Sequence, residues 1–210
     1  MSLPQAEPDS ATTPLPKTVR LRDGRSCLIR LISPADADRL QRFVRGLSED
    51  SAHQRFFAAV HQLSPAQLQR FTASSDPMDF AVIALARDSA DTPIAGTARC
   101  LRASAAGSHG DSASVASSGA TAVEFAVTVA DAWQGAGLGR LLLTELIALA
   151  RQRGVGVIQG EALSENTRML DLARCLGFTV RADPNDARAS LLRLKLSPEA
   201  SPVRHPDGSG

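Results

Sequence analysis

The stretch that most constrains the fold is residues 127–143, where an apolar strand pattern gives way to a glycine-rich turn and then to a leucine-rich helix. Three glycines stand two residues apart in that turn. The first amide groups of a helix have no partners within the helix and lie at the positive end of its dipole. Glycines let a ligand approach these amides closely. The pattern therefore predicts a phosphate site of the nucleotide-binding type between Gln134 and Arg140.

The composition is typical of a globular protein with a large core. Of the 210 residues, 43% are hydrophobic and 21% are charged, and the net charge is +1, which gives no reason to expect a nucleic-acid or membrane partner. Cys27, Cys100 and Cys175 are scattered and odd in number, so we expect no disulfide framework and no zinc site. No apolar run is long enough to span a membrane, and the N-terminus lacks the pattern of a signal peptide. We therefore expect a cytoplasmic location.

Three segments are too rich in small and polar residues to pack. Residues 1–16 and 197–210 are expected to be disordered tails, and residues 104–120 a flexible hairpin loop inside the domain. The remaining span, 17–196, is expected to form a single domain.

Periodicity within that domain alternates between strands and helices. The sequence predicts helices first, then a meander of strands, then a strand–helix–strand–helix–strand half. Predicted helices cover 35–47, 138–153 and 165–176, and two more follow Ser48 and Ser64. Predicted strands cover 26–32, 79–86, 93–101, 122–130, 155–160, 177–181 and 189–196.

Two common phosphate motifs fit the turn poorly. A P-loop would need Gly-Lys-Ser/Thr, which is absent. The dinucleotide fingerprint G-x-G-x-x-G fails because Arg140 stands where its third glycine belongs. Glu161 does stand about 20 residues further on, where a ribose-binding acid would be. An NAD-binding alternative therefore stays open.

A third pattern fits better. The run Gln134-x-x-Gly137-x-Gly139 resembles the Q/R-x-x-G-x-G/A motif of the GNAT superfamily of acyl-CoA-dependent N-acyltransferases. The segment from Asn166 to the Gly-Phe pair at 177–178 is similar to the late helix of that family. The resemblance implies an α/β (α+β) fold in which a mixed, mostly antiparallel central sheet has helices on both faces.

A narrower resemblance points to one branch of that superfamily. Residues 30–36, 55–57 and 122–129 resemble the catalytic domain of bacterial Pat-type protein lysine acetyltransferases. In the superfamily the early helices form the wall of the acceptor side. In this chain these helices carry Arg55-Phe56-Phe57. These residues could equally be an amphipathic core contact.

The resemblance also implies which residues bind acetyl-CoA. Val127 and Val129 would pair with the pantetheine arm, and one of their amides would polarise the thioester carbonyl. Asn166 would contact the cofactor near the pantetheine, or it could simply cap its helix. The residues implied for the pyrophosphate are Gln134, Gly135, Gly137, Leu138, Gly139 and Arg140.

Glu124 is the candidate catalytic residue. Alternation along 122–130 places it, with Ala126 and Thr128, on the strand face opposite the valines. If that strand is covered on both faces, burial raises the pKa of the carboxyl group toward the operating pH, as a general base requires. The Pat-type resemblance implies the same role. The alternatives are an exposed strand carboxylate and a buried ion-pair partner.

One family feature is missing. Many members carry a tyrosine seven residues after the asparagine, as general acid for the thiolate, but this chain has Ala173 there and no tyrosine at all. Cys175 lies about 200° further round the helix and should face elsewhere. We infer that the thiolate takes a proton from water or leaves unprotonated. The four histidines show no ligand spacing, so no metal is expected.

The sequence thus predicts an acetyl-CoA-dependent N-acetyltransferase that acts by direct attack, with a protein lysine as the expected acceptor. A small-molecule amine and a non-catalytic acyl-CoA-binding module are the alternatives. An acidic acceptor pocket would favour a polycation, and an open groove would favour a protein. A homodimer that pairs strands near 189–196 also stays open.

Overall fold

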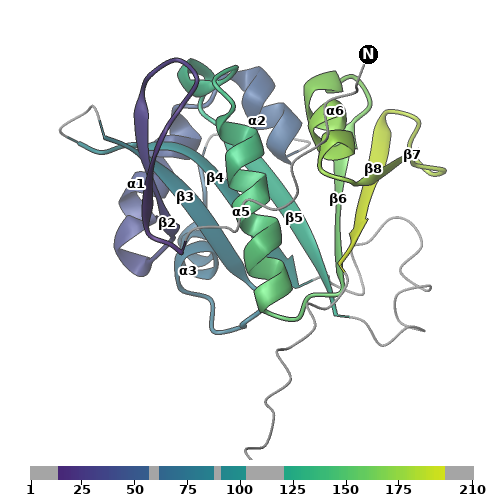
Figure 1. Cartoon of the computed structure of the whole chain (residues 1–210), viewed down its shortest axis with the longest axis horizontal. Coiled ribbons are helices and arrows are strands. Elements are labelled where there is room, and N and C mark those ends of the chain that lie inside the picture. The colour runs from purple at the N-terminus through teal and green to yellow at the C-terminus, as the bar shows by residue number, and fades with distance from the viewer. Residues whose placement is uncertain (1–13, 57–61, 88–90, 103–120, 197–210) are drawn as a thin grey trace, which may run out of the picture.

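In the computed structural model, one eight-stranded sheet runs through the molecule with helices on both faces (Figure 1). The structure describes residues 14–56, 62–87, 91–102 and 121–196. The expected loop at 104–120, the expected tail at 197–210 and most of the expected N-terminal tail lie outside these ranges. The strands are β1 Lys17–Arg20, β2 Ser26–Leu31, β3 Phe80–Ala86, β4 Ile94–Arg102, β5 Ala122–Val129, β6 Val157–Leu163, β7 Thr179–Ala182 and β8 Ala189–Lys195. The helices are α1 Ala37–Arg45, α2 Glu49–Phe56, α3 Pro65–Ala73, α5 Leu138–Gln152 and α6 Thr167–Cys175.

The strand order is β1-β2-β3-β4-β5-β6-β8-β7, and every pair is antiparallel except β5–β6. This confirms the expected mixed, mostly antiparallel sheet. β1 was not predicted, because its four residues are only half-buried or exposed and carry no run of apolar alternation. It nevertheless pairs along its whole length with β2.

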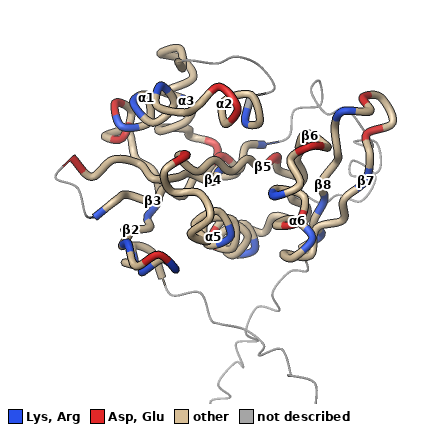
Figure 2. Tube along the Cα trace, turned by 90° about the horizontal axis from the view of Figure 1, so that it is seen from above, with Lys and Arg blue, Asp and Glu red and all other residues tan. Residues whose placement is uncertain are grey.

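The helices form two layers, seen from above in Figure 2. α5 and α6 lie on one side of the sheet, and α1, α2 and α3 lie on the other. This confirms the expectation of helices on both faces. The second layer stops at β5 and β6, which leaves β8 and β7 without a described helix on that side.

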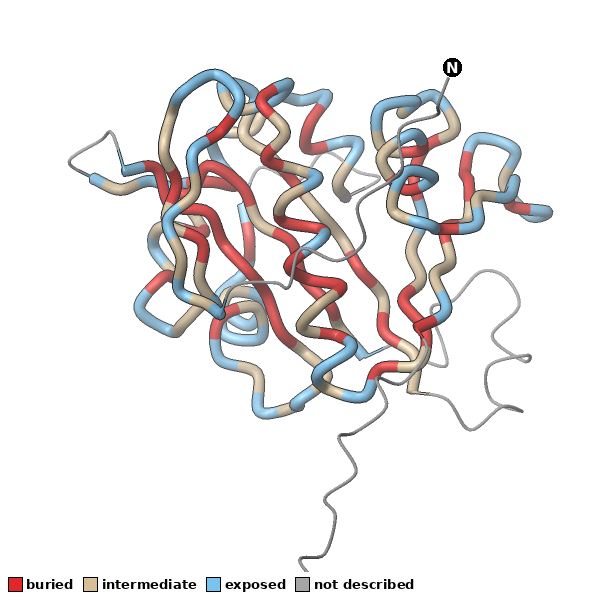
Figure 3. Tube along the Cα trace, in the orientation of Figure 1, coloured by how far each residue is buried: buried red, intermediate tan, exposed pale blue. Residues whose placement is uncertain are grey.

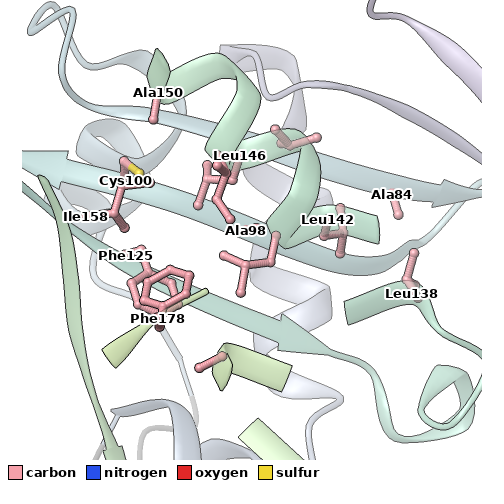
Figure 4. Close-up of a cluster of buried hydrophobic side chains, with 14 of the residues drawn as sticks. Ala84, Ala98, Cys100, Phe125, Leu138, Leu142, Leu146, Ala150, Ile158 and Phe178 are labelled. Atoms are coloured by element: carbon pink, nitrogen blue, oxygen red, sulfur yellow. The ribbon is translucent and has the colours of Figure 1, made fainter. Parts of the chain in front are cut away.

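The main core lies between α5 and the middle strands (Figures 3 and 4). The leucine-rich helix predicted over 138–153 is confirmed as α5. Its Leu138, Leu142 and Leu146 are almost completely buried, and Leu149 is partly buried against the same core. Gly96 on β4 allows the helix to come this close, since an added Cβ would lie 2.9 Å from Cδ1 of Leu142. The beginning of α5, and with it the glycine-rich turn, is therefore fixed against the sheet.

The helix predicted at 35–47 begins differently from the prediction. Residues Pro34–Asp36 form a 3-10 turn, and the α-helix starts only at Ala37. Asp36 is fully buried and accepts two hydrogen bonds from the Arg30 guanidinium, at 2.6 and 2.7 Å, and one from the Ser33 amide. The side chain of Asp36 thus ends the tight turn and joins it to β2.

Candidate active site

A cleft opens where β5 and β6 separate. The two strands are in register at only three positions, from Ala122 opposite Val157 to Glu124 opposite Gln159. β5 then continues to Val129 and β6 to Leu163 without pairing with each other. A cavity of about 1190 Å³ fills the opening, with α2 and α6 among its walls.

Two aromatic side chains of the main core pack together beside the narrow end of the cleft, which is the point where the pairing of β5 with β6 ends. The Phe125 and Phe178 rings lie 5.0 Å apart (Figure 4). A Cβ on Gly160 would lie 2.8 Å from the Phe125 ring and 3.1 Å from the Phe125 carbonyl oxygen. Only glycine fits at position 160, so the packing of Phe125 against Gly160 fixes the point at which β5 and β6 separate.

Glu124 stands at this narrow end. It lines the cavity, is half-buried, and shares a face of β5 with Ala126 and Thr128, as the alternation predicted. Burial raises the pKa of the carboxyl group above its ordinary value, and Arg70 partly opposes the rise. Such a carboxylate can accept a proton more readily than an exposed one.

Val127 and Val129 line the cavity further along β5. Their side chains pack against the main core. Beyond Glu124, β5 no longer pairs with β6, so this edge of the strand faces the opening. An extended ligand can add to such an edge as a further strand does.

The glycine-rich turn follows directly. Gly135 and Gly137 have φ values of 78° and 89°, which favour glycine, and Gly137 is the N-cap of α5. The first helical hydrogen bond runs from the Leu141 amide to the Gly137 carbonyl, so the amides before it lie at the open end of the helix. This is the geometry of an anion site.

The predicted pyrophosphate residues differ in placement. Gln134 lines the cavity, whereas the five that follow it lie in the turn and first helical residues beyond the lining. Leu138 has its side chain in the core, so only its backbone could contact a ligand. Arg140 is exposed. A Cβ on Gly139 would lie in ordinary contact with Val129 and Leu172, which shows how closely the helix start approaches β5 and α6.

Gln134 uses its side chain to join elements. Its Nε2 donates to Ser51 Oγ at 3.1 Å and to the Val129 carbonyl at 3.3 Å. Asp131, just before it, accepts hydrogen bonds from Ser48 and Ser51 at the start of α2. Burial raises the pKa of Asp131, but these hydrogen bonds outweigh it and hold the pKa below its ordinary value. The turn and the α2 wall of the cleft are therefore fixed to each other.

Asn166 has the capping role that was one of its two alternatives. Its Oδ1 accepts from the Met169 amide at 3.1 Å, and its Nδ2 donates to Gln54 Oε1 at 3.2 Å. The residue also lines the cavity, so capping does not exclude a cofactor contact.

Comparison with known proteins identifies the family. The sequence matches the acetyltransferase (GNAT) family over residues 47–178, which is more than half of the chain. The chain belongs to the GNAT acetyltransferase family. It is 31% identical over 176 residues to an acetyltransferase of Pseudomonas aeruginosa, with 84% of this chain and 87% of that protein covered. The family uses acetyl-CoA, so the alternative of an NAD site, which depended on Glu161, is wrong.

Two solved structures resemble this GNAT acetyltransferase. The GNAT domain of S. lividans PAT has a TM-score of 0.71 at 29% identity, covering 86% of this chain and 96% of that one. The resemblance to the Pat-type branch is thus confirmed. The Salmonella typhimurium protein yncA, solved with its cofactor acetyl-CoA, has a TM-score of 0.61 at 22% identity over 85% of this chain and 99% of its own, which shows a shared fold. As a member of the family, the protein is an acetyl-CoA-dependent acetyltransferase.

Two arginines lie on the α1–α3 side of the sheet; Arg55 lines the cleft and Arg99 does not, and only Arg55 was singled out from the sequence. Arg99 on β4 is almost completely buried, donates to the Phe71 carbonyl at 3.0 Å and lies over the Phe71 ring. Burial lowers the pKa of Arg55 to about 10, and burial together with Arg55 lowers that of Arg99 to about 9. With Thr128 they line a second cavity of about 20 Å³. Nothing in a sequence marks a strand arginine as buried.

Arg22 was also missed. Its side chain lies beside Gly137, with Nε 3.6 Å from where a Cβ of Gly137 would be, and its amide donates to the Ala136 carbonyl. Arg25 of the same β1–β2 turn lies over the ring of Trp133, which comes directly before Gln134. A cation thus lies beside the glycine-rich turn through a contact between segments more than 100 residues apart.

The position that carries a tyrosine in many relatives is part of the core here. Ala173 is fully buried and Cys175 is exposed, and neither lines the cavity. In the described ranges no group of three or more His, Cys, Asp or Glu side chains could hold a metal ion. Among the same residues, no helix is long and apolar enough to cross a membrane.

Proposed function

We propose that this GNAT acetyltransferase transfers the acetyl group to the side-chain amine of a protein lysine by direct attack, with Glu124 as general base. The observation that carries the proposal is the position of Glu124: a half-buried carboxylate with a raised pKa, at the narrow end of the cleft where β5 leaves β6.

The amine must lose a proton before it attacks. A lysine side chain is protonated at neutral pH, with an ordinary pKa of about 10.4. Glu124 takes that proton, directly or through one water molecule. The nitrogen then attacks the thioester carbonyl and forms a C–N bond, and an amide of Val127 or Val129 stabilises the oxyanion. The C–S bond breaks, and the thiolate takes a proton from water.

The co-substrate is held by backbone more than by side chains. Val127 and Val129 pair with the pantetheine arm, and Asn166 contacts it from the start of α6. The pyrophosphate lies on the amides that begin α5, with a charge-assisted contact from Arg140. The residues of this pyrophosphate site are Gln134, Gly135, Gly137, Leu138, Gly139 and Arg140.

The charge of the cleft supports a protein lysine over a polyamine. Arg55 lines the cleft and Arg99 lies behind it, beside the small second cavity that Arg55 also lines, so a polycation would be repelled there. The cavity is an open groove with a large volume, which suits a side chain presented on a polypeptide. The Pat-type resemblance points to the same acceptor.

Release of free CoA with different amines tests the acceptor. The amines are a lysine-bearing peptide, the same peptide with arginine in place of lysine, free lysine and spermidine. We expect the highest kcat/KM for the lysine peptide and background release with the arginine peptide. A higher kcat/KM for a small amine would contradict the proposal. Binding of acetyl-CoA in calorimetry, without release for any amine, would favour a non-catalytic acyl-CoA-binding module.

A further inference from the structure

The C-terminal half of the sheet has an open face beside Glu124. α1, α2 and α3 cover the strands from β2 to β5, and α2 also contacts β6. Within the described residues, no helix covers β8 and β7 on that side (Figure 2). The cavity that starts at Glu124 continues over this face, with residues of β6, β8 and β7 in its lining.

Strand register shows which side chains share the face with Glu124. Glu124 lies opposite Gln159, Gln159 opposite Arg193, and Arg193 opposite Thr179. Side chains directly opposite each other in a sheet point to the same face. This row therefore runs from the candidate base across the open face to the edge of the sheet.

The charged side chains of the face are mostly cations. Arg193 lies in the row itself, Arg181 lies two residues along β7, and Lys195 lies two residues along β8. Glu161 on β6 is the one anion that lines the cavity on these three strands, so three cations stand against one anion. Arg181, Lys195 and Glu161 are exposed. The face thus carries an excess of positive charge, although the chain as a whole has a net charge of only +1.

We propose that this face, defined by Arg181, Arg193 and Lys195, docks the polypeptide around the acceptor lysine and selects segments with acidic residues near that lysine. The inference rests on the proposed protein-lysine function and adds a sequence preference to it. Positive and negative surfaces that meet in this way favour encounter and set register.

The distances suit a short peptide. Neighbouring strands lie about 4.8 Å apart, so Arg193 is about 10 Å and β7 about 14 Å from Glu124 across the sheet. An extended chain advances about 3.3 Å per residue. Acidic residues about three or four positions from the lysine would therefore reach Arg193 and Arg181 when the lysine reaches Glu124.

Three peptides with one central lysine test the preference. They carry aspartates, serines or arginines at the third and fourth positions on both sides. For the wild-type protein we expect kcat/KM to be roughly tenfold higher for the aspartate peptide than for the serine peptide, mainly through KM, and lowest for the arginine peptide. The preference should weaken as salt shortens the range of charge interactions.

Charge reversal on the face provides the decisive variant. Arg181→Glu/Lys195→Glu changes two exposed side chains and should reverse the order, so that the arginine peptide becomes the better substrate. The matched control is Arg151→Glu/Arg168→Glu, which changes two exposed arginines on α5 and α6 outside the cavity lining and should keep the wild-type order. A single lysine amide without flanking residues should react equally with the wild-type protein and with the control variant.

The possible results distinguish a failure of the docking inference from a failure of the proposed protein-lysine function. If no peptide is acetylated faster than free lysine, the protein-lysine function fails. If the peptides are acetylated with equal kcat/KM, or if both double variants change the order alike, the docking inference alone fails. Sedimentation velocity gives a further outcome: a wild-type dimer that becomes a monomer on Arg181→Glu/Lys195→Glu, without a flank preference, would make the face an interface between copies and overturn the inference.

Discussion

The Phe125 ring occupies the space in which any residue other than glycine at position 160 would place its Cβ. That Cβ would lie 2.8 Å from Cε1 of Phe125 and 3.1 Å from the Phe125 carbonyl oxygen. Both residues come one position after the last registered pair of β5 and β6, Glu124 and Gln159. The close approach of an aromatic residue and a glycine therefore marks the start of the cleft.

Gly160→Ala should destabilise the protein and disturb the cleft. The added methyl group meets a ring and a backbone atom, and overpacking of this kind costs about 1–3 kcal/mol. We expect a lower midpoint of denaturant unfolding and weaker binding of acetyl-CoA in calorimetry. A variant with unchanged stability would show that β5 and β6 can separate further without cost.

Gly137→Ala should weaken acetyl-CoA binding more than it weakens the fold. Gly137 has a φ of 89° at the start of α5, and an alanine there costs about 1–2 kcal/mol of strain. Gly154→Ala is a matched control, because Gly154 has a φ of 72°, lies at the other end of α5 and has open space around its Cβ position. Both variants should lose similar stability, but only Gly137→Ala should raise the dissociation constant of acetyl-CoA. Equal affinities would mean that the turn does not hold the cofactor.

Asp36→Asn should destabilise the protein at neutral pH. Burial raises the pKa of Asp36, but hydrogen bonds from Arg30 and Ser33 outweigh it and lower the pKa to about 2. Because this is below the ordinary value of 3.8, the stabilisation is present above about pH 3.8 and is lost as the pH falls toward 2. Breaking a buried pair of this kind costs about 3–5 kcal/mol.

The pH dependence distinguishes this pair from a general loss of packing. The difference in unfolding free energy between wild type and Asp36→Asn, measured by urea denaturation, should shrink between about pH 4 and pH 2. A difference that stays constant over this range would show that the charge of Asp36 contributes nothing.

Glu124→Gln should make the protein more stable at neutral pH. Burial is the main reason that the pKa of Glu124 is raised, so the ionised form is disfavoured in the folded state. When folding raises the pKa of a carboxyl group, the resulting stabilisation is fully present below the pKa of the unfolded state. It is lost as the pH rises through the pKa of the folded state. The melting temperature of the variant should exceed that of the wild type at pH 7 to 8, and the gap should close below about pH 4.5. A less stable variant at neutral pH would instead indicate that Glu124 is an ion-pair partner.

The sequence was informative where chemistry and periodicity coincide. The strand, turn and helix around Gly137 follow from local pattern, and so does the face of β5 that carries Glu124. β1 was missed because Lys17–Arg20 has no apolar alternation, and its place depends on pairing with β2. The α-helix predicted from residue 35 begins at Ala37 because Asp36 bonds back to Arg30.

The rest of the site depends on contacts between distant segments. Arg22 reaches Gly137, Ser51 reaches Gln134 and Asp131, and Arg99 is buried under α3. Each of these residues is an ordinary polar residue in its own stretch of sequence. The positive face beside Glu124 likewise depends on the register of β6, β8 and β7, which a single sequence does not specify.

The role of Glu124 as general base can be measured from the pH dependence of kcat/KM for Glu124→Gln and wild type, with a lysine peptide and saturating acetyl-CoA. We expect the variant to lose about 10²- to 10⁴-fold in kcat/KM at neutral pH, and the rise of the wild-type rate through the pKa of Glu124 to disappear. The dissociation constant of acetyl-CoA should not change. Equal kcat/KM for the two proteins across the pH range would contradict the assignment of Glu124 as the general base.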